Sequence, residues 1–270
     1  GTGSPFSRTT ALNMKVKDPV DIETLRTAAA SKGGLLTDEL RRKVWPKLLN
    51  INVYDLPHKP DLSWKKTLLD IQTDMKRGRM AIAMLDTLSN FHLRDFMDPT
   101  MDSTKHILNY LMPILEQVDA ELHDFMIRAE VGTIFALSWL ITWYGHVLSE
   151  FKHTLRLYDF FLASHPLMPI YLAATIVLHR EKEVKQTECD MAMVHHLLSR
   201  IPPDLPYELL IGQAQELFEQ YPPSLLAKRL TVSSTSSSGR IVKVKEKKTA
   251  ELFRNHLCLV KTCERGFKKQ

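Results

Sequence analysis

Hydrophobic residues recur along this chain at intervals of three and four positions, and strict alternation with polar residues is rare. Such spacing places apolar side chains on one face of an α-helix. A clear example is the stripe of Trp64, Leu68, Ile71 and Met75 in the stretch LSWKKTLLDIQTDMKR. The chain holds only 10 glycines among 270 residues, which also disfavours a fold rich in strands and tight turns. The pattern therefore predicts an all-α protein built from many helices.

Start and stop signals predict where the first helices lie. The stretch DIETLRTAAA has helical spacing, and the Gly33–Gly34 pair that follows it favours a helix end. Thr37 is suited to cap the N-terminus of a second helix, DELRRKVWPKLL, because its hydroxyl can accept from a free backbone N–H. We expect Pro46 to disturb the last turn of that helix.

Proline, glycine and serine divide the rest of the chain. Breakers separate successive helical stretches between Phe91 and Pro223; they are Asp98-Pro99, Gly132, His165-Pro166, Pro202-Pro203 and Pro222-Pro223. We therefore expect a polar leader over residues 1–35, a multi-helix domain over 36–223, and a Ser-rich linker with a basic disordered tail over 224–270.

Charge and cysteine usage limit the partners and the compartment. The net charge is +5, but residues 240–270 alone carry ten Lys or Arg and three Asp or Glu, so the domain itself is slightly acidic. We expect no nucleic-acid binding by the domain and at most weak contact of the tail with an anionic membrane. Three cysteines and the absence of an export signal favour the cytoplasm. The most apolar window, residues 134–148, is too short for a transmembrane anchor, which needs roughly 20 residues.

Three stretches in a fixed order carry a family resemblance. They are LRRKVWPKLL, with Arg41 and Trp45 four positions apart; IQTDMKR, with Ile71, Asp74 and Arg77; and FALSWLITWYGHVLSEFKHTLRLYDFFLA, which contains Tyr158 and Asp159. In this order, on a helical background, they resemble the TBC domain of Rab GTPase-activating proteins. The resemblance covers about residues 36–223. It implies a multi-helix fold in which Arg41, Trp45 and Ile71 belong to structural motifs.

The resemblance also implies a chemistry. GTP hydrolysis builds negative charge on the transferring phosphoryl group, and an arginine supplied in trans offsets that charge. By resemblance Arg77 is that arginine finger, Asp74 orients it, and the partner is a Rab GTPase in its GTP form at endoplasmic reticulum or Golgi membranes. GTP and magnesium then belong to the partner, and the chain regulates an enzyme without a cofactor of its own. Spacing alone favours a solvated ion pair of Asp74 and Arg77 on a helix surface, and the family context favours the catalytic role.

The chain departs from the family pattern in one region. None of its seven tyrosines is followed two positions later by glutamine, so the family's Tyr-x-Gln glutamine finger is absent. Only 13 residues separate Arg77 from Phe91, where family members carry several dozen more. We hypothesise an omitted internal segment. The alternatives are a non-catalytic module that binds a Rab or another protein, and a binder of nucleic acid or acidic membrane through the tail.

No residue pattern predicts a metal site or a self-contained enzyme. Cys189, His195 and His196, with His179 nearby, have no second ligand pair at a spacing typical of zinc sites. The chain has no Gly-rich phosphate loop and no clear Ser/His/Asp set. We expect no metal and no cofactor.

Overall fold

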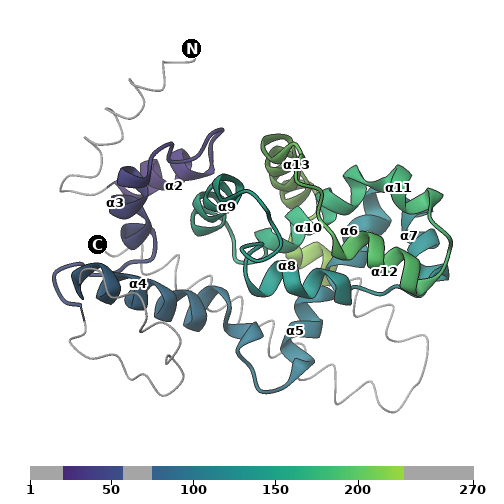
Figure 1. Cartoon of the computed structure of the whole chain (residues 1–270), viewed down its shortest axis with the longest axis horizontal. Helices are drawn as coiled ribbons and strands as arrows, with labels where there is room; N and C mark the ends of the chain where they lie inside the picture. Colours follow the sequence, from purple (N-terminus) through teal and green to yellow (C-terminus); the bar gives the residue numbers. More distant parts are fainter. Residues whose placement is uncertain (1–20, 57–74, 228–270) are drawn as a thin grey trace. The chain divides into compact units, whose positions relative to one another are not determined.

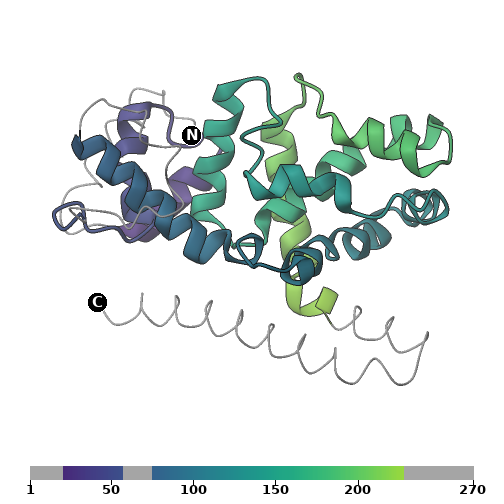
Figure 2. The ribbon, with the colours of Figure 1, turned by 60° about the horizontal axis from the view of Figure 1, so that its bottom comes forward.

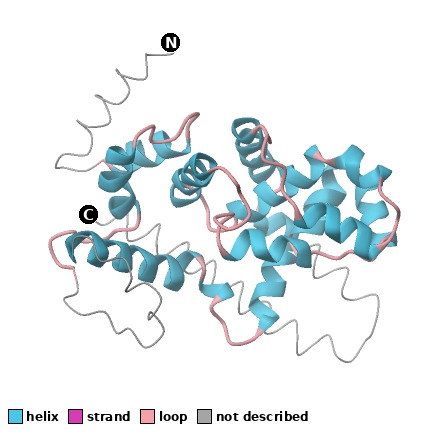
Figure 3. Ribbon diagram, in the orientation of Figure 1, coloured by secondary structure: helices cyan, strands magenta, loops and turns pink. Residues whose placement is uncertain are grey.

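The computed structural model describes residues 21–56 and 75–227, with the backbone alone for residues 75–78. Every regular element in these ranges is a helix or a helical turn, and loops join them (Figure 3). The all-α prediction is confirmed. In chain order the elements are α2 (Ile22–Ala30), α3 (Asp38–Leu48), α4 (Met75–Thr87), the π-helical turn η2 (Leu88–His92), the 3-10 turn η3 (Arg94–Phe96), α5 (Met101–Leu108), α6 (Leu111–Val118), α7 (Ala120–Arg128), the 3-10 turn η4 (Ile134–Ala136), α8 (Leu137–Ile141), α9 (Phe151–Ala163), α10 (Met168–His179), α11 (Glu181–Gln186), α12 (Met191–Ser199) and α13 (Tyr207–Gln220).

Helix α10 is the most deeply buried element of the described structure. Its residues from Met168 to Val177 are all buried, so it presents apolar side chains in every direction. A helix with no polar face is stable only when other helices surround it. Helix α13 packs most extensively on α10, followed by α6, while α8 and α11 make smaller contacts (Figure 1).

The first two helices begin and end at the residues that the sequence signals predict. Asp21 caps α2 by accepting a hydrogen bond from the Thr24 N–H at 3.0 Å. The chain leaves that helix through Gly33 and Gly34, whose φ angles are +82° and +60°, a region that glycine adopts at little cost. Thr37 then caps α3 by accepting from the Leu40 N–H at 3.3 Å. The predicted cap and stop signals are confirmed.

Helices α2 and α3 both pack against α9, as Figures 1 and 2 show from two directions. Leu25 and Ala29 of α2 and Leu35 of the following loop have no exposed surface. On α3, Leu40 and Val44 are equally buried. The packed structure therefore includes residues 22–35, which the sequence pattern had placed in a leader outside the domain.

Helix α4 is far less covered. From Arg79 to Thr100 no residue is buried, although this stretch contains the apolar run Met80–Leu85. The side chains of Phe91 and Met97 are 56% and 52% exposed. The principal contact of α4 is with η2, the turn that directly continues it. A helix in a protein is stabilised mainly by packing its apolar side chains against other elements. Because the apolar side chains of α4 are incompletely covered, this helix gains little stability from packing.

The chain divides into two compact units after Gln220. Of the second unit the structure describes residues 221–227, and residues 223–227 form a helical turn. The predicted basic tail lies outside the described residues. Among the helices in the described ranges, none has the length and hydropathy required to cross a membrane.

Replacing Leu25 with alanine tests whether α2 is part of the packed domain. We expect Leu25→Ala to lower the free energy of unfolding by about 2–5 kcal/mol, because it removes a fully buried side chain and leaves a cavity. Thr27→Ala, at an exposed position of the same helix, should change it by less than about 0.5 kcal/mol. Urea denaturation measures both; equal, small effects would show that α2 does not contribute to the core.

Candidate functional site

A buried carboxylate, that of Asp159 on α9, joins three segments of the chain. Asp159 has no exposed surface and accepts hydrogen bonds from Arg41 Nε at 3.1 Å and Arg41 Nη2 at 3.0 Å. The indole N–H of Trp45 donates to it at 2.7 Å, and the backbone N–H of Leu35 donates at 3.0 Å. These donors offset the cost of removing the charge from water. The two named residues of the Arg-x-x-x-Trp motif are thus hydrogen-bond donors to one aspartate.

The loop between α2 and α3 approaches this carboxylate very closely at Gly34. A Cβ atom at this position would lie 2.5 Å from Asp159 Oδ2, which is less than the sum of van der Waals radii. The φ angle of +60° also disfavours any residue with a side chain. Glycine is therefore required here for both space and backbone conformation, and it allows Leu35 N–H to reach the carboxylate.

A second ion pair, formed by buried Arg156 with the more exposed Glu208, lies one turn away on the same face of α9. Arg156 donates to Glu208 of α13 at 2.6 Å and to the carbonyl oxygen of Ser31, after the end of α2, at 3.1 Å. Burial alone would raise the pKa of the Glu208 carboxyl, but the hydrogen bond and charge of Arg156 outweigh it and lower the pKa. A cation at the carbonyl end of α2 also complements the helix dipole.

A chain of aromatic rings leads from Trp45 to the segment that follows α4. Trp45 contacts Tyr158 with ring centroids 6.0 Å apart, and Tyr158 lies edge-on to Trp143 at 5.7 Å. Trp143 in turn contacts His92 of η2 at 5.3 Å. The hydroxyl of Tyr158 donates to the carbonyl oxygen of Thr142 at 3.0 Å. Through these contacts the aspartate site is connected to the end of the helix that carries Arg77.

Two residues in this ring chain have an unusual backbone. Trp143 and Tyr144 have φ angles of +45° and +67°, a conformation that costs about 1–3 kcal/mol for bulky residues. The hydroxyl of Tyr144 donates to the carbonyl oxygen of Pro169 at 2.9 Å, and its ring stacks on Phe161. These buried contacts hold the strained turn and point Trp143 toward His92.

The predicted site residues have different positions in the structure. Arg41 and Trp45 come together at Asp159, as described above. Arg77 lies in the first turn of α4, where the structure describes the backbone alone. Ile71 and Asp74 lie outside the described residues. The proposed pair of Asp74 and Arg77 therefore stays a prediction.

Residues grouped as candidate metal ligands have other contacts. His195 Nδ1 lies 3.2 Å from the hydroxyl of Ser199, one turn along α12, and Cys189 Sγ lies 3.9 Å from the carbonyl oxygen of Phe125. The acids Asp119, Glu121 and Glu181 do come together, but Lys185 Nζ lies within 3.4 Å of each. In this group the chain's own ammonium occupies the position of a cation.

The contribution of the buried aspartate can be measured with a matched pair of variants. Asp159→Ala should lower the free energy of unfolding by about 3–5 kcal/mol, because it leaves the Arg41 guanidinium buried without its main partner. Asp38 is the other partner of Arg41, and its side chain is 67% exposed. Asp38→Ala should therefore lower the free energy of unfolding by less than about 1 kcal/mol. Guanidinium denaturation gives both values, and similar losses would contradict the central role of Asp159.

The pH dependence of stability should contain a contribution from His92. His92 is partly exposed, but its ring is largely shielded from water; this desolvation, together with the charge of Arg26, lowers its pKa from 6.5 to about 4. As pH falls from 6.5 towards 4, the unfolded chain takes up a proton at this residue while the folded protein does not, so stability falls. His92→Phe keeps the ring and removes the titration. Thermal melts should show a weaker pH dependence in this interval for the variant, and identical slopes would contradict the assignment.

Comparison with known proteins finds a family match over part of the described structure. The model of the Rab-GTPase-TBC domain matches residues 74–185, a stretch that starts at Asp74 and contains Arg77, Tyr158 and Asp159. TBC1 domain family member 20 from Homo sapiens is 52% identical over 267 residues, covering 78% of this chain and 66% of the relative, and the Bos taurus protein gives the same values. GTPase-activating protein gyp10 from Schizosaccharomyces pombe is 32% identical over 178 residues, covering 64% of this chain and 48% of the relative.

The alignment with the mammalian relatives also shows that this chain is shorter within the matched region. The aligned stretch has 267 residues, yet 78% of 270 residues is about 211. About 56 aligned positions of the relative therefore have no residue in this chain. The chain spans 66% of the relative's length, just under two thirds. With the domain match, this identity and the helical fold taken together, the chain belongs to the family of proteins with a Rab-GTPase-TBC domain.

Proposed function

We propose that this chain is a GTPase-activating protein for a Rab GTPase, with Arg77 as the arginine finger. The observation that carries the proposal is the place of Arg77 at the start of α4, within a matched Rab-GTPase-TBC domain. The relative gyp10 is itself named as a GTPase-activating protein. An arginine supplied in trans stabilises the charge of the phosphoryl-transfer transition state and contributes ~10³ to 10⁵ in rate.

The partner and its surroundings belong to the same proposal. The Rab GTPase binds in its GTP form and brings both the nucleotide and magnesium, while Asp74 orients the guanidinium of Arg77 through a paired hydrogen bond. By its similarity to TBC1 domain family member 20, the chain acts in the cytoplasm at endoplasmic reticulum and Golgi membranes. The basic tail adds weak attraction to anionic lipid, at about 1 kcal/mol per basic residue near the surface.

The activity of this chain should be far below that of a longer relative. We propose that most of the positions absent from the alignment fall between Arg77 and Phe91, where the family carries its Tyr-x-Gln motif. The lack of buried residues from Arg79 to Thr100 supports this, because α4 would lack the helices that normally cover it. A finger displaced by about 1 Å can lose ~10²-fold in rate, and the attacking water also lacks its glutamine.

A second candidate function is a catalytically impaired module that binds a Rab and does not accelerate hydrolysis. The absence of Tyr-x-Gln and the exposed face of α4 favour it. Binding to a Rab loaded with a non-hydrolysable GTP analogue separates the two candidates. Binding without any stimulation would establish the module and overturn the catalytic proposal.

Single-turnover GTP hydrolysis by a panel of Rab GTPases tests the role of Arg77. We expect the chain to stimulate GTP hydrolysis weakly. Arg77→Ala should abolish this stimulation, whereas the control Arg79→Ala, two positions away on α4, should retain it. Insertion of the relative's segment with its Tyr-x-Gln should raise the stimulated rate by at least about tenfold. Stimulation that is unchanged by Arg77→Ala would show that Arg77 is an ordinary surface charge.

A further inference from the structure

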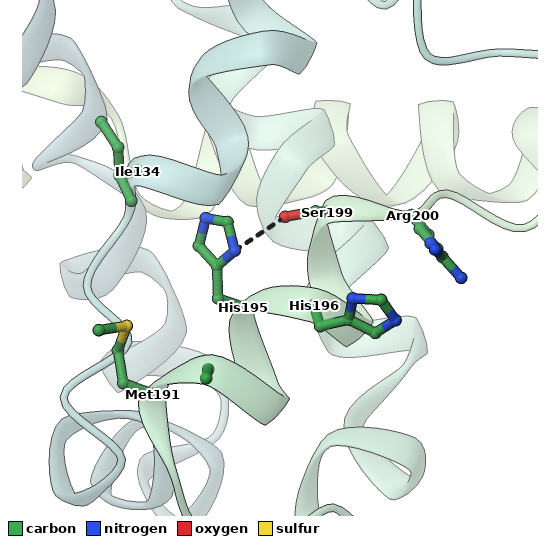
Figure 4. Close-up of a pocket in the computed structure, with 7 residues that line it drawn as sticks. Ile134, Met191, His195, His196, Ser199 and Arg200 are labelled. Carbon is green, nitrogen blue, oxygen red and sulfur yellow. Dashed lines mark hydrogen bonds between the residues drawn. The ribbon is translucent and has the colours of Figure 1, made fainter.

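An open groove lies between η4 and α12, away from the aspartate site (Figure 4). Its volume is about 560 Å³. Ile134 and Met191 form one end, His195 lies in the middle, and His196 and Arg200 form the other end. The groove therefore has an apolar end and a cationic end.

Both ends of α12 are held by hydrogen bonds, so this wall of the groove is formed in advance. At the N-terminus, the carboxylate of Asp190 accepts from the backbone N–H groups of Ala192 and Met193 at 2.9 and 3.2 Å. At the C-terminus, buried Arg180 donates to the carbonyl oxygens of Leu197 and Arg200 at 3.0 and 2.8 Å. A preformed wall reduces the ordering cost that a ligand must overcome.

The large apolar side chains at one end of the groove are exposed to solvent. Ile134 is 50% exposed, Met191 is 53% exposed, and neighbouring Met193 is 48% exposed. Methionine side chains adapt to the shape of an apolar partner and are common at surfaces that bind peptides. Covering these side chains removes apolar surface from water, which favours association.

The polar end of the groove is positively charged. Arg200 is a lining residue, and among the described residues that line the groove none is acidic. Arg200 is exposed, so its side chain is accessible to a partner. His195 is already bonded to Ser199 on the same helix, and the described part of the chain places no carboxylate on His195. This Ser–His pair thus lacks the third member of a hydrolytic triad, and the groove is suited to binding.

We propose that the groove binds an acidic amphipathic helical peptide of a partner protein. An apolar side chain of the peptide lies between Ile134 and Met191, and a carboxylate bonds to Arg200. Met191 and Arg200 are nine positions apart on the chain, which corresponds to about 13 Å along a helix. A peptide helix of two to three turns covers that span and presents both groups, as in other helix-in-groove complexes. The chain's own tail does not fit, because its net charge has the same sign as Arg200.

Binding of designed peptides tests this proposal independently of Rab activity. Fluorescence anisotropy would compare a labelled amphipathic helix of Leu and Glu with matched Leu–Gln and Leu–Lys helices. We expect the full chain to bind the Leu–Glu peptide at least about tenfold more tightly than either control. Arg200→Glu should remove that preference, whereas Arg42→Glu, the same change at an exposed position of α3, should leave it.

Blocking the apolar end gives a second, independent readout. Ala192 lines the groove and is exposed, so Ala192→Glu should leave the melting temperature unchanged while weakening the Leu–Glu peptide about tenfold or more. Equal binding of the Leu–Glu and Leu–Lys peptides would overturn the proposal. An affinity for the Leu–Glu peptide that neither Arg200→Glu nor Ala192→Glu changes would also overturn it. So would a chain that binds phosphatidylserine vesicles but does not bind the peptide.

Discussion

A carboxylate without solvent exposure imposes a strict condition on the structure around it. Asp159 meets that condition because Arg41, Trp45 and Leu35 direct donors at its two oxygens. These residues lie more than a hundred positions away along the chain, so the bonds form only when α3 and the preceding loop are seated on α9. Removing any donor would leave a buried charge less well satisfied. The left-handed loop at Gly34 follows from this requirement, because it lets the Leu35 N–H approach the carboxylate.

Local sequence signals predicted the elements of this region but not their contacts. Helical spacing, the Thr37 cap and the Gly33–Gly34 stop depend on a few neighbouring residues, and each has the predicted place. The Arg-x-x-x-Trp motif was recognised as structural, but spacing within one helix cannot show that its two members share an acceptor on α9.

Because local spacing cannot reveal contacts between distant segments, the sequence pattern placed α2 outside the domain and did not identify some residues of the site. Residues 22–35 look polar in sequence because only one face of α2 is apolar, and Leu25 and Ala29 gain their burial from α9. One sequence signal did point to Asp159, which is an acid set between Tyr158 and Phe160 in an aromatic helix. Arg156 and Glu208 carried no such signal, because a pair of charges 52 positions apart is identifiable only after α9 and α13 are placed.

The two halves of the candidate site differ in how firmly they are held. The aspartate site and its ring chain end at His92, and α4 with its Arg77 lies just before that residue. The side chains from Arg79 to Thr100 are incompletely covered, so the helix beneath the proposed finger depends on few contacts. Because transition-state stabilisation requires a fixed geometry, this difference connects the shortened domain to the weak activity proposed for it.

Hydrogen exchange at the Asp159 site is the most direct measurement of the claim that this carboxylate organises the fold. The Leu35 amide and the Trp45 indole N–H both donate to Asp159, so their exchange should require the opening of the α3–α9 contact. We predict that NMR will show both protons protected to nearly the same degree as amides of buried α10. Exchange of Leu35 N–H and Trp45 Nε1–H at the rate of exposed loop amides would contradict the account.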